Sequence, residues 1–190
     1  MTLTIGIMCK EGIVLAADKR ASLGHYVGSD REDKVVKITN NIAITLAGTL
    51  SHAQRVIKLI RAELELKRVR SKQQPSVKEA ANLIANFLMG EAHFLVAGVD
   101  ADGFHLYNVM SDGAIDKENY ATSGAYGTFV GNSVLDDKWK PNMTIDEGKK
   151  MAFEILRSTV KRDTTVGGGI NVMTIDRQGV SEITLEKISQ

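Results

Sequence analysis

The order of the predicted elements indicates an α+β fold in which two antiparallel sheets lie between outer pairs of helices. Hydrophobic periodicity predicts strands, two helices, strands, two helices and final strands along the 190 residues. Because a sheet or a helix buries its apolar face against another layer, this order predicts two stacked sheets with helices outside them. A hydrophobic content of 43% is sufficient for such a core, and no linker or repeat divides the sequence. We therefore expect one domain over residues 1–190.

The first part of the chain has the composition of strands. Residues 4–8 and 13–17 are apolar or β-branched and flank a turn at residues 10–12, which predicts a hairpin. The second of these strands is apolar throughout, as is typical of a strand buried on both faces. Residues 21–33 contain two glycines and four charges without helical periodicity, and they predict a loop. Two further strands are predicted after this loop, at residues 35–38 and at residues 42–47, the second ending at Gly48.

A long helix is predicted next. Ser51 and Gln54 form a capping box at its start, and Pro75 ends the segment. Its core-facing stripe consists of Ala53, Val56, Ile57, Ile60 and Leu64. A second apolar stripe, which indicates a face packed against another subunit, consists of Leu59, Ala62, Leu66 and Val69. The basic residues near the end predict either a nucleic-acid patch or a solvated helix end, and we favour the solvated end because cations suit this end of the helix dipole.

The remaining elements repeat the alternation of helices and strands. A second helix begins at a capping box of Ser76 and Glu79 and ends at Gly90. The later strands are predicted at residues 94–99, 104–109, 115–120, 170–175 and 181–185. The later helices are predicted at residues 128–138 and after a capping box of Thr144 and Glu147, the last one carrying Met151, Ala152, Ile155 and Leu156 on its apolar face.

Composition excludes several classes of function. The net charge of +1 provides no strong field for nucleic acid or for a membrane surface. No apolar run approaches the ~20 residues of a membrane helix, and no export signal is present, so we expect a cytoplasmic protein. The single Cys9 excludes an internal disulfide bond. The four histidines lie far apart in the sequence, and we expect neither a metal site nor a cofactor.

The second residue carries a reactive combination of groups. Once Met1 is removed, Thr2 presents a hydroxyl and a free α-amine on one residue. A hydroxyl needs an adjacent base to act as a nucleophile, and an α-amine with a pKa of about 8 is such a base. Taken alone, a threonine at this position is usually only a small residue that permits methionine removal. Asp18 and Lys34 stand where the strand pattern would otherwise be apolar, and both can reach the start of the chain.

Several sequence motifs carry a family resemblance. The stretches TLTIGI, GIVLAADKRAS, KVVKI and AITLAG, in this order and spacing, resemble the amino-terminal half of proteasome β subunits, most closely the archaeal kind. The later stretches ENYATSG and RDTTVGGGINV resemble the carboxy-terminal half of the same family. The resemblance implies a four-layer αββα sandwich of the Ntn-hydrolase class. It also implies a threonine endopeptidase that acts on unfolded polypeptides, without a cofactor.

The resemblance further implies an assembly. Family members form heptameric rings of β subunits stacked with rings of α subunits, and a regulatory ATPase acts on the particle indirectly. The second apolar stripe of the long helix agrees with burial against such partners. Neither nucleic acid nor membrane is expected among the partners.

The resemblance also assigns roles to single residues. Thr2 corresponds to the nucleophile, Asp18 to its acidic partner and Lys34 to the cation that activates the hydroxyl. Without the family, Asp18 would be a strand-end carboxylate paired with a neighbour, and Lys34 would be solvated. Gly48 corresponds to the glycine whose backbone N–H binds the oxyanion, and without the family it is equally a turn glycine. The supporting positions are Arg20, beside the acid, and Asp163, the late aspartate.

Three departures from the family pattern bear on activity. Ala125 and Val166 occupy positions where family members usually carry serines that hydrogen-bond around the amine. Each lost hydrogen bond is worth about 1 kcal/mol, and Thr165 or Ser123 is a possible replacement donor. Only Met1 precedes Thr2 in this sequence, so we expect the amine to be exposed by methionine removal rather than by cleavage of a longer propeptide.

Two alternative functions therefore stay open. A non-catalytic β subunit that completes a ring beside active subunits would carry such departures. An Ntn-type amidase acting on small molecules would instead have a closed pocket and assemble alone.

The pocket for the substrate side chain is predicted less sharply. By position, Ala21, Leu46 and Leu50 match residues beneath the scissile bond, and such an apolar pocket favours apolar or aromatic side chains. Glu32 at the pocket mouth would instead admit a basic side chain.

Overall fold

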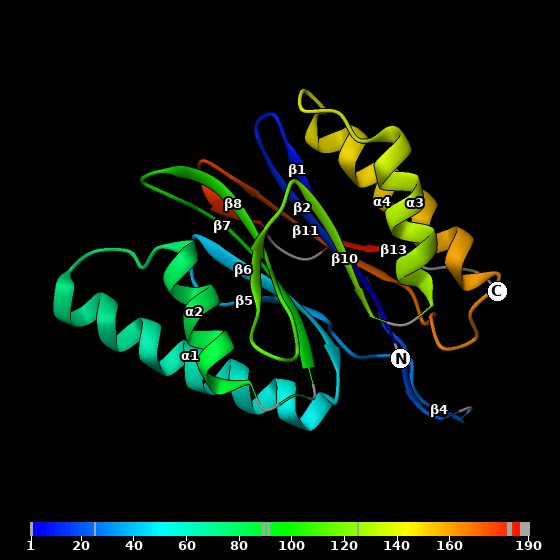
Figure 1. The fold of residues 1–190 in the computed structure, drawn as a ribbon, viewed down its shortest axis with the longest axis horizontal. Helices are drawn as coiled ribbons and strands as arrows, with labels where there is room; N and C mark the ends of the chain where they lie inside the picture. The colour runs from blue at the N-terminus through cyan, green and yellow to red at the C-terminus, as the bar shows by residue number, and fades with distance from the viewer. Residues whose placement is uncertain are drawn as a thin grey trace.

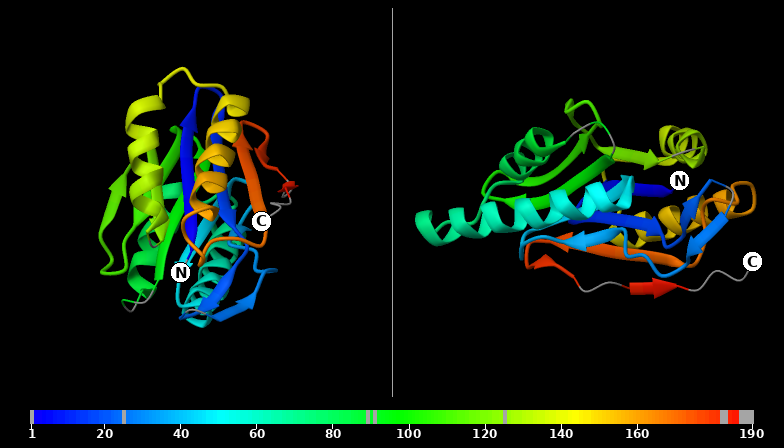
Figure 2. Two further views of the ribbon diagram at one scale, coloured as in Figure 1. Left: turned by 90° about the vertical axis from the view of Figure 1, so that its right-hand side faces the viewer. Right: turned by 90° about the horizontal axis from the view of Figure 1, so that it is seen from below.

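The molecule has four layers, with two sheets stacked between two pairs of helices (Figure 1). The computed structural model describes residues 2–24, 26–88, 90, 92–124, 126–181 and 184–186. Figure 1 shows α1 and α2 on one side of the strands and α3 and α4 on the opposite side, and the two views of Figure 2 show the same layers. The predicted α+β sandwich of antiparallel sheets and outer helices is confirmed.

The first sheet contains the start of the described chain. Its strands follow the order β10-β1-β2-β11-β12, and β13 also pairs with β11. All these pairs are antiparallel. The strands are β1 (Leu3–Cys9), β2 (Gly12–Asp18), β10 (Tyr120–Gly124), β11 (Ile170–Asp176), β12 (Gly179–Val180) and β13 (Thr184–Glu186). The central position of β2 explains why all its residues are buried, as its apolar run predicted.

The second sheet is also antiparallel, in the order β5-β6-β7-β8-β9. Its strands are β5 (Val35–Lys37), β6 (Ile42–Gly48), β7 (Ala92–Asp100), β8 (Gly103–Val109) and β9 (Ile115–Lys117). A separate small hairpin is formed by β3 (Ala21–Leu23) and β4 (Tyr26–Ser29). In Figures 1 and 2, β4 lies at the end of the molecule where β1 begins.

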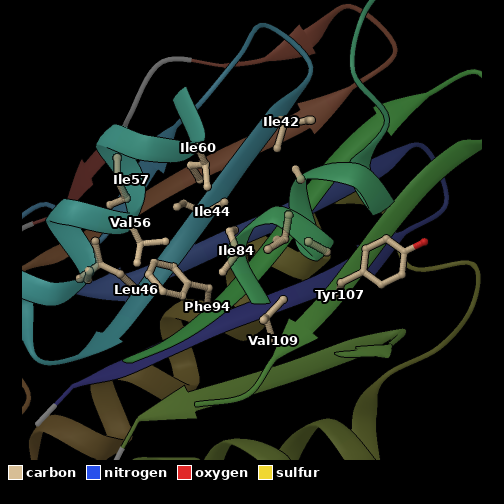
Figure 3. Close-up of a cluster of buried hydrophobic side chains, with 14 of the residues drawn as sticks. Ile42, Ile44, Leu46, Val56, Ile57, Ile60, Ile84, Phe94, Tyr107 and Val109 are labelled. Atoms are coloured by element: carbon tan, nitrogen blue, oxygen red, sulfur yellow. The ribbon is translucent and has the colours of Figure 1, made fainter. Parts of the chain in front are cut away.

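Apolar side chains fill the three spaces between the four layers. The helices are α1 (Leu50–Ser71), α2 (Val77–Phe87), α3 (Gly127–Lys138) and α4 (Ile145–Val160). One cluster lies between the second sheet and α1 and α2, where Ile44, Ile60 and Phe94 point toward one another (Figure 3). A second cluster joins the first sheet to α3 and α4, and a third lies between the two sheets. Burial of these clusters is the main stabilising term of the fold.

Both apolar stripes predicted for the long helix α1 are found, one buried and one exposed. All five residues predicted for its core-facing stripe are buried. From the second stripe, Leu59 and Leu66 are each 42% exposed and Val69 is 60% exposed. None of the described helices is long and apolar enough to cross a membrane.

The prediction of a capping box at Ser51 is wrong. Helix α1 begins at Leu50, and its N-cap is Thr49, whose side chain makes no capping hydrogen bond. The cause is the short connection from β6, which turns at Gly48 with a φ of 104° directly into the helix. By contrast, the capping boxes of Ser76 with Glu79 and of Thr144 with Glu147 are confirmed, although α2 ends at Phe87, before Gly90.

One loop prediction and one strand prediction also need correction. Residues 21–33 were predicted as a loop but contain β3 and β4, which pair only with each other and have a bulge between Ala21 and Ser22. Residues 115–120 were predicted as one strand, but β9 ends at Lys117 in the second sheet, and β10 starts at Tyr120 in the first sheet. The polar residues of β10 form a strand because they pair with β1. The strand predicted at residues 181–185 lies partly outside the described residues.

Candidate active site

The site is built around Thr2, which immediately precedes β1. Thr2 is only 5% exposed. The next residue, Leu3, pairs with Gly124 on β10, and this pairing brings the two backbones into close contact. A Cβ atom added at Gly124 would lie 1.8 Å from the carbonyl oxygen of Thr2. A glycine at this point of β10 is therefore necessary for the observed position of Thr2.

Asp18, at the end of β2, is the buried centre of a hydrogen-bond network. Its Oδ1 atom accepts from the backbone N–H of Leu3 at 3.1 Å and from Nζ of Lys34 at 2.8 Å. Its Oδ2 atom accepts from the backbone N–H groups of Arg20 at 3.0 Å and of Gly167 at 3.1 Å. The carboxylate is fully buried. Asp18 thus connects the lysine directly to the residue that follows Thr2.

Lys34 is a buried cation. Its side chain is 5% exposed, and Nζ donates to the Asp18 carboxylate and to the backbone carbonyl of Arg20. Burial lowers the pKa of Lys34, while the negative charges of Asp18 and Glu32 counteract this effect. The sequence alone would leave this lysine solvated, but the structure places it inside the site beside its predicted acidic partner.

Arg20 holds a loop that follows α4. Its guanidinium forms a two-point ion pair with Asp30, at 2.8 Å and 3.2 Å, and donates to the carbonyl of Thr164 at 2.9 Å. The ion pair raises the pKa of Arg20 and lowers the pKa of Asp30. The Cζ atom of Arg20 would lie 2.7 Å from a Cβ added at Gly167. Arg20 therefore packs against the loop whose N–H group binds Asp18.

Asp163 lies in the same loop and has one unused oxygen. Its Oδ1 atom accepts from the backbone N–H and the hydroxyl of Thr165. Its Oδ2 atom is buried and has no hydrogen-bond partner among the described residues. Among the two replacement donors that the sequence suggests, the Thr165 hydroxyl is therefore already used, whereas the buried hydroxyl of Ser123 has no partner in the described part of the chain.

The two departures from the family pattern differ in what the structure shows. Val166 is fully buried in the apolar cluster between the first sheet and its helices. Its apolar side chain supplies no hydrogen bond, and its backbone N–H donates to the carbonyl of Asp163 at 3.2 Å. Ala125 lies outside the described residues, as does Met1.

A cavity of about 430 Å³ opens beside Thr2. Its lining includes Thr2, Lys34 and Gly48 together with the four predicted pocket residues Ala21, Glu32, Leu46 and Leu50. Arg20 also lines it, so eight of the predicted residues are brought to one cavity. Asp18 lies behind Lys34, and neither Asp163 nor Val166 is part of the lining.

The lining also contains residues that the sequence analysis missed. They are Ser22, Leu23 and Gly28, which belong to the β3–β4 hairpin, and Ala47 and Thr49, which flank Gly48. The available signal was the turn glycine Gly24 between two short stretches of β-forming residues. The many charges after residue 29 obscured this signal.

The arrangement suits nucleophilic chemistry at a hydroxyl. A threonine lies in a cavity with a buried ammonium group, which stabilises negative charge that develops nearby. Gly48 ends β6 at the same cavity, in a backbone conformation that favours glycine. No cluster of three or more potential metal ligands is found among the described residues.

The sequence is similar to known proteins along its whole length. The chain matches the family model described as proteasome subunit over residues 2–175. The proteasome subunit beta of Archaeoglobus profundus is 34% identical over 196 residues, covering 100% of this chain and 91% of the relative. The corresponding protein of Ferroglobus placidus is 36% identical over 194 residues, covering 98% and 92%. Proteasome subunit beta 2 of Pyrococcus abyssi is 38% identical over 193 residues, with coverage of 98% and 92%.

Proposed function

Because the chain belongs to the proteasome subunit family and is a β subunit of the 20S core, we propose that it is a threonine-type endopeptidase with Thr2 as its nucleophile. One observation carries the proposal. The Asp18 carboxylate binds both Lys34 and the N–H group of Leu3, so a buried cation is tied to the residue next to Thr2. This geometry holds at a cavity that both Thr2 and Lys34 line.

The proposed reaction has two steps. After removal of Met1, the α-amine of Thr2 accepts the hydroxyl proton, directly or through a water, while Oγ1 attacks the carbonyl carbon of a peptide bond. Lys34 stabilises the negative charge that develops on the reacting oxygens, and the backbone N–H of Gly48 binds the oxyanion. The C–N bond breaks, and the leaving amine takes the proton. Water then attacks the resulting ester, releases the second product and restores Thr2.

The remaining residues position these groups. Asp18 holds Lys34, while Arg20 and Asp163 order the loop that donates the N–H of Gly167 to Asp18. The Oδ2 atom of Asp163 and the hydroxyl of Ser123, which have no partner among the described residues, are proposed as acceptors or donors for the threonine amine.

The cavity supports a preference for apolar side chains. Ala21, Leu46 and Leu50 contribute apolar surface to it. Glu32 is half-buried at the same cavity and adds a negative charge, which favours a basic side chain as the second choice. We place the apolar preference first because three of the four predicted pocket residues are apolar.

The chain assembles with other proteasome subunits, as its family implies. We propose a heptameric β ring stacked on α subunits, with unfolded polypeptides as substrates, a regulatory ATPase acting indirectly, and a cytoplasmic location. The exposed apolar face of α1, formed by Leu59, Leu66 and Val69, supports burial against a neighbouring subunit.

The proposed activity is tested by intact mass spectrometry of the purified assembly before and after treatment with a peptide epoxyketone. This reagent needs both the hydroxyl and the free amine of a terminal threonine. We expect loss of Met1 and one adduct per subunit. The Thr2→Ala variant is the matched control and should gain no adduct. Retained Met1 without an adduct in the unmodified sequence would contradict the proposal.

A second candidate function is that of a non-catalytic structural subunit. The observation that favours it is the complete burial of Val166 in an apolar cluster, which leaves this position without a hydrogen bond for the amine. The same mass measurement separates the two functions. A structural subunit would assemble normally but gain no adduct.

The pH dependence of turnover tests the role of Lys34. The charged form of Lys34 is the active one. Because burial lowers the pKa of Lys34, the alkaline decrease of kcat/KM should occur at a lower pH than the ordinary titration of lysine. The negative charge of Glu32 favours the protonated form of Lys34. Glu32→Gln should therefore move the alkaline limb to lower pH.

The profile is best measured with an uncharged peptide substrate, because Glu32 also lines the cavity. Glu65→Gln is the control, since this carboxylate lies exposed on α1 and pairs with Arg68. An alkaline limb that stays in place or moves to higher pH in Glu32→Gln would contradict the assigned role of Lys34.

A further inference from the structure

A hydrogen-bonded link connects β11 with the segment that carries Lys34. Asp33, the residue before Lys34, accepts at its Oδ1 atom from Nδ2 of Asn171 at 2.7 Å. The same oxygen forms an ion pair with Lys19, the residue after Asp18. Lys19 and Asp33 are the chain neighbours of Asp18 and Lys34, which form the buried ion pair. Asn171 is thus linked to residues beside both members of that pair.

Asn171 occupies a position that is otherwise apolar. It lies on β11 opposite Ala17 of β2, and it alternates with Ile170 and Val172, so it faces the same side as Met173. Ala17 and Met173 belong to the apolar cluster between the two sheets. Asn171 is fully buried, and its Oδ1 atom has no hydrogen-bond partner among the described residues.

This placement is unfavourable for the fold alone. A buried acceptor without a partner costs free energy that an apolar side chain of similar size would avoid. The amide does make one directed hydrogen bond, to Asp33. The use of an asparagine here is therefore explained by that bond rather than by packing.

The segment that receives the bond is held by separate contacts: Asp30 pairs with Arg20, the N–H of Glu32 bonds to the carbonyl of Lys19, and the carbonyl of Lys34 accepts from the N–H of Leu46. Residues 30–34 form no helix or strand, and the side chain of Asp33 is 57% exposed. The ion pair of Asp33 with Lys19 contributes little to the order of this segment, because water and salt screen the exposed carboxylate and both side chains lose conformational freedom. Asn171 differs because its strand is paired on one side with β2 and on the other with β13. Its amide therefore has a fixed place.

We propose that Asn171 is a positioning residue for the proteolytic site, which fixes through Asp33 the backbone that carries Lys34. This inference depends on the proposed threonine peptidase activity. It adds a residue from the first sheet, which is not part of the cavity lining, to the parts that set the geometry of catalysis.

Steady-state kinetics of the assembled particle with an apolar peptide substrate test the proposal. In Asn171→Leu we expect kcat to fall about 10-fold and KM to stay within about 2-fold, because the substrate pocket is intact and only the cation is misplaced. Asp33→Ala should cause the same loss, and the double variant should be no worse than either single variant. Asp33→Asn keeps an acceptor for Asn171 and should retain most of the activity.

Asn108→Leu is the matched control. Asn108 lies on β8 in the other sheet and also has a buried Oδ1 atom without a partner among the described residues, so the substitution makes the same chemical change away from the site. Its kcat should not change. Equal losses in Asn108→Leu and Asn171→Leu, additive losses in the double variant, or an unchanged kcat in Asn171→Leu would overturn the proposal.

A readout without turnover separates this inference from the proposed function. Hydrogen–deuterium exchange of a peptide spanning residues 30–37 reports the order of the segment, since the N–H of Glu32 bonds to the carbonyl of Lys19. We expect about 10-fold faster exchange in Asn171→Leu and no change in Asn108→Leu. If the unmodified particle proves inactive, faster exchange still supports the link, and unchanged exchange refutes it.

Discussion

Replacing Lys34 with alanine is expected to reduce kcat of the assembled particle by about 10²- to 10³-fold, the range found when one stabilising group for a developing oxyanion is removed. The ammonium group of Lys34 is buried beside the cavity and bound to Asp18, and the substitution leaves the nucleophile without it. KM should change little, because the pocket residues Leu46 and Leu50 are untouched. Single-turnover kinetics with an apolar peptide would measure the effect on the chemical step.

The same substitution should leave the fold and the assembly intact. Removing one member of a buried ion pair typically costs about 3–5 kcal/mol, because the other charge stays buried. Asp18, however, keeps three backbone N–H donors, from Leu3, Arg20 and Gly167. We therefore expect a smaller loss of about 1–3 kcal/mol, measured by thermal unfolding.

Lys37→Ala is the control for charge removal. Lys37 is the last residue of β5, the strand that Lys34 precedes. Its Nζ atom makes one long hydrogen bond of 3.4 Å to the carbonyl of Val180. Its removal should change neither kcat nor assembly. Unchanged turnover in an assembled Lys34→Ala particle would exclude the catalytic role assigned to Lys34.

The sequence predicts the parts of the site that lie at the ends of apolar strands. Asp18 and Gly48 each end a run of buried residues, so their place at a strand end follows from hydrophobic patterning. Lys34 directly precedes the apolar pair Val35 and Val36 of β5, of which Val35 is buried. Their proposed roles came from the family resemblance, and the structure adds that Thr2, Lys34 and Gly48 line one cavity.

The elements that the sequence did not predict depend on contacts distant in the chain. Strand β10 contains Tyr120, Ala121, Thr122, Ser123 and Gly124, which lack an apolar run, and it is a strand because β1 pairs with it. Arg20 and Asp30 flank the β3–β4 hairpin, and the pairing of Ala21 with Ser29 in it brings the two side chains together. The bond from Asn171 to Asp33 spans 138 residues. No local pattern indicates such partners.

Replacing Gly124 with alanine is expected to lower both stability and turnover. Gly124 has a φ of 131°, which L side chains rarely adopt, and the new methyl group would lie 1.8 Å from the carbonyl oxygen of Thr2. A strained backbone conformation costs about 1–3 kcal/mol, and relief of the clash requires the start of β1 to move. We expect a total loss of about 3 kcal/mol or more. Since Thr2 moves with β1, kcat should fall about 10²-fold.

Gly103→Ala separates the two causes. Gly103, the first residue of β8, has a φ of 113°, but an added Cβ would have no atom within 4 Å. This variant therefore carries the backbone strain without the contact to Thr2, and it should lose about 1–3 kcal/mol of stability with unchanged kcat. Thermal unfolding and steady-state kinetics of both variants measure the difference. Equal effects on kcat would mean that the close approach of Gly124 to Thr2 does not hold the nucleophile in place, whereas a loss confined to Gly124→Ala would make β10 part of the catalytic geometry.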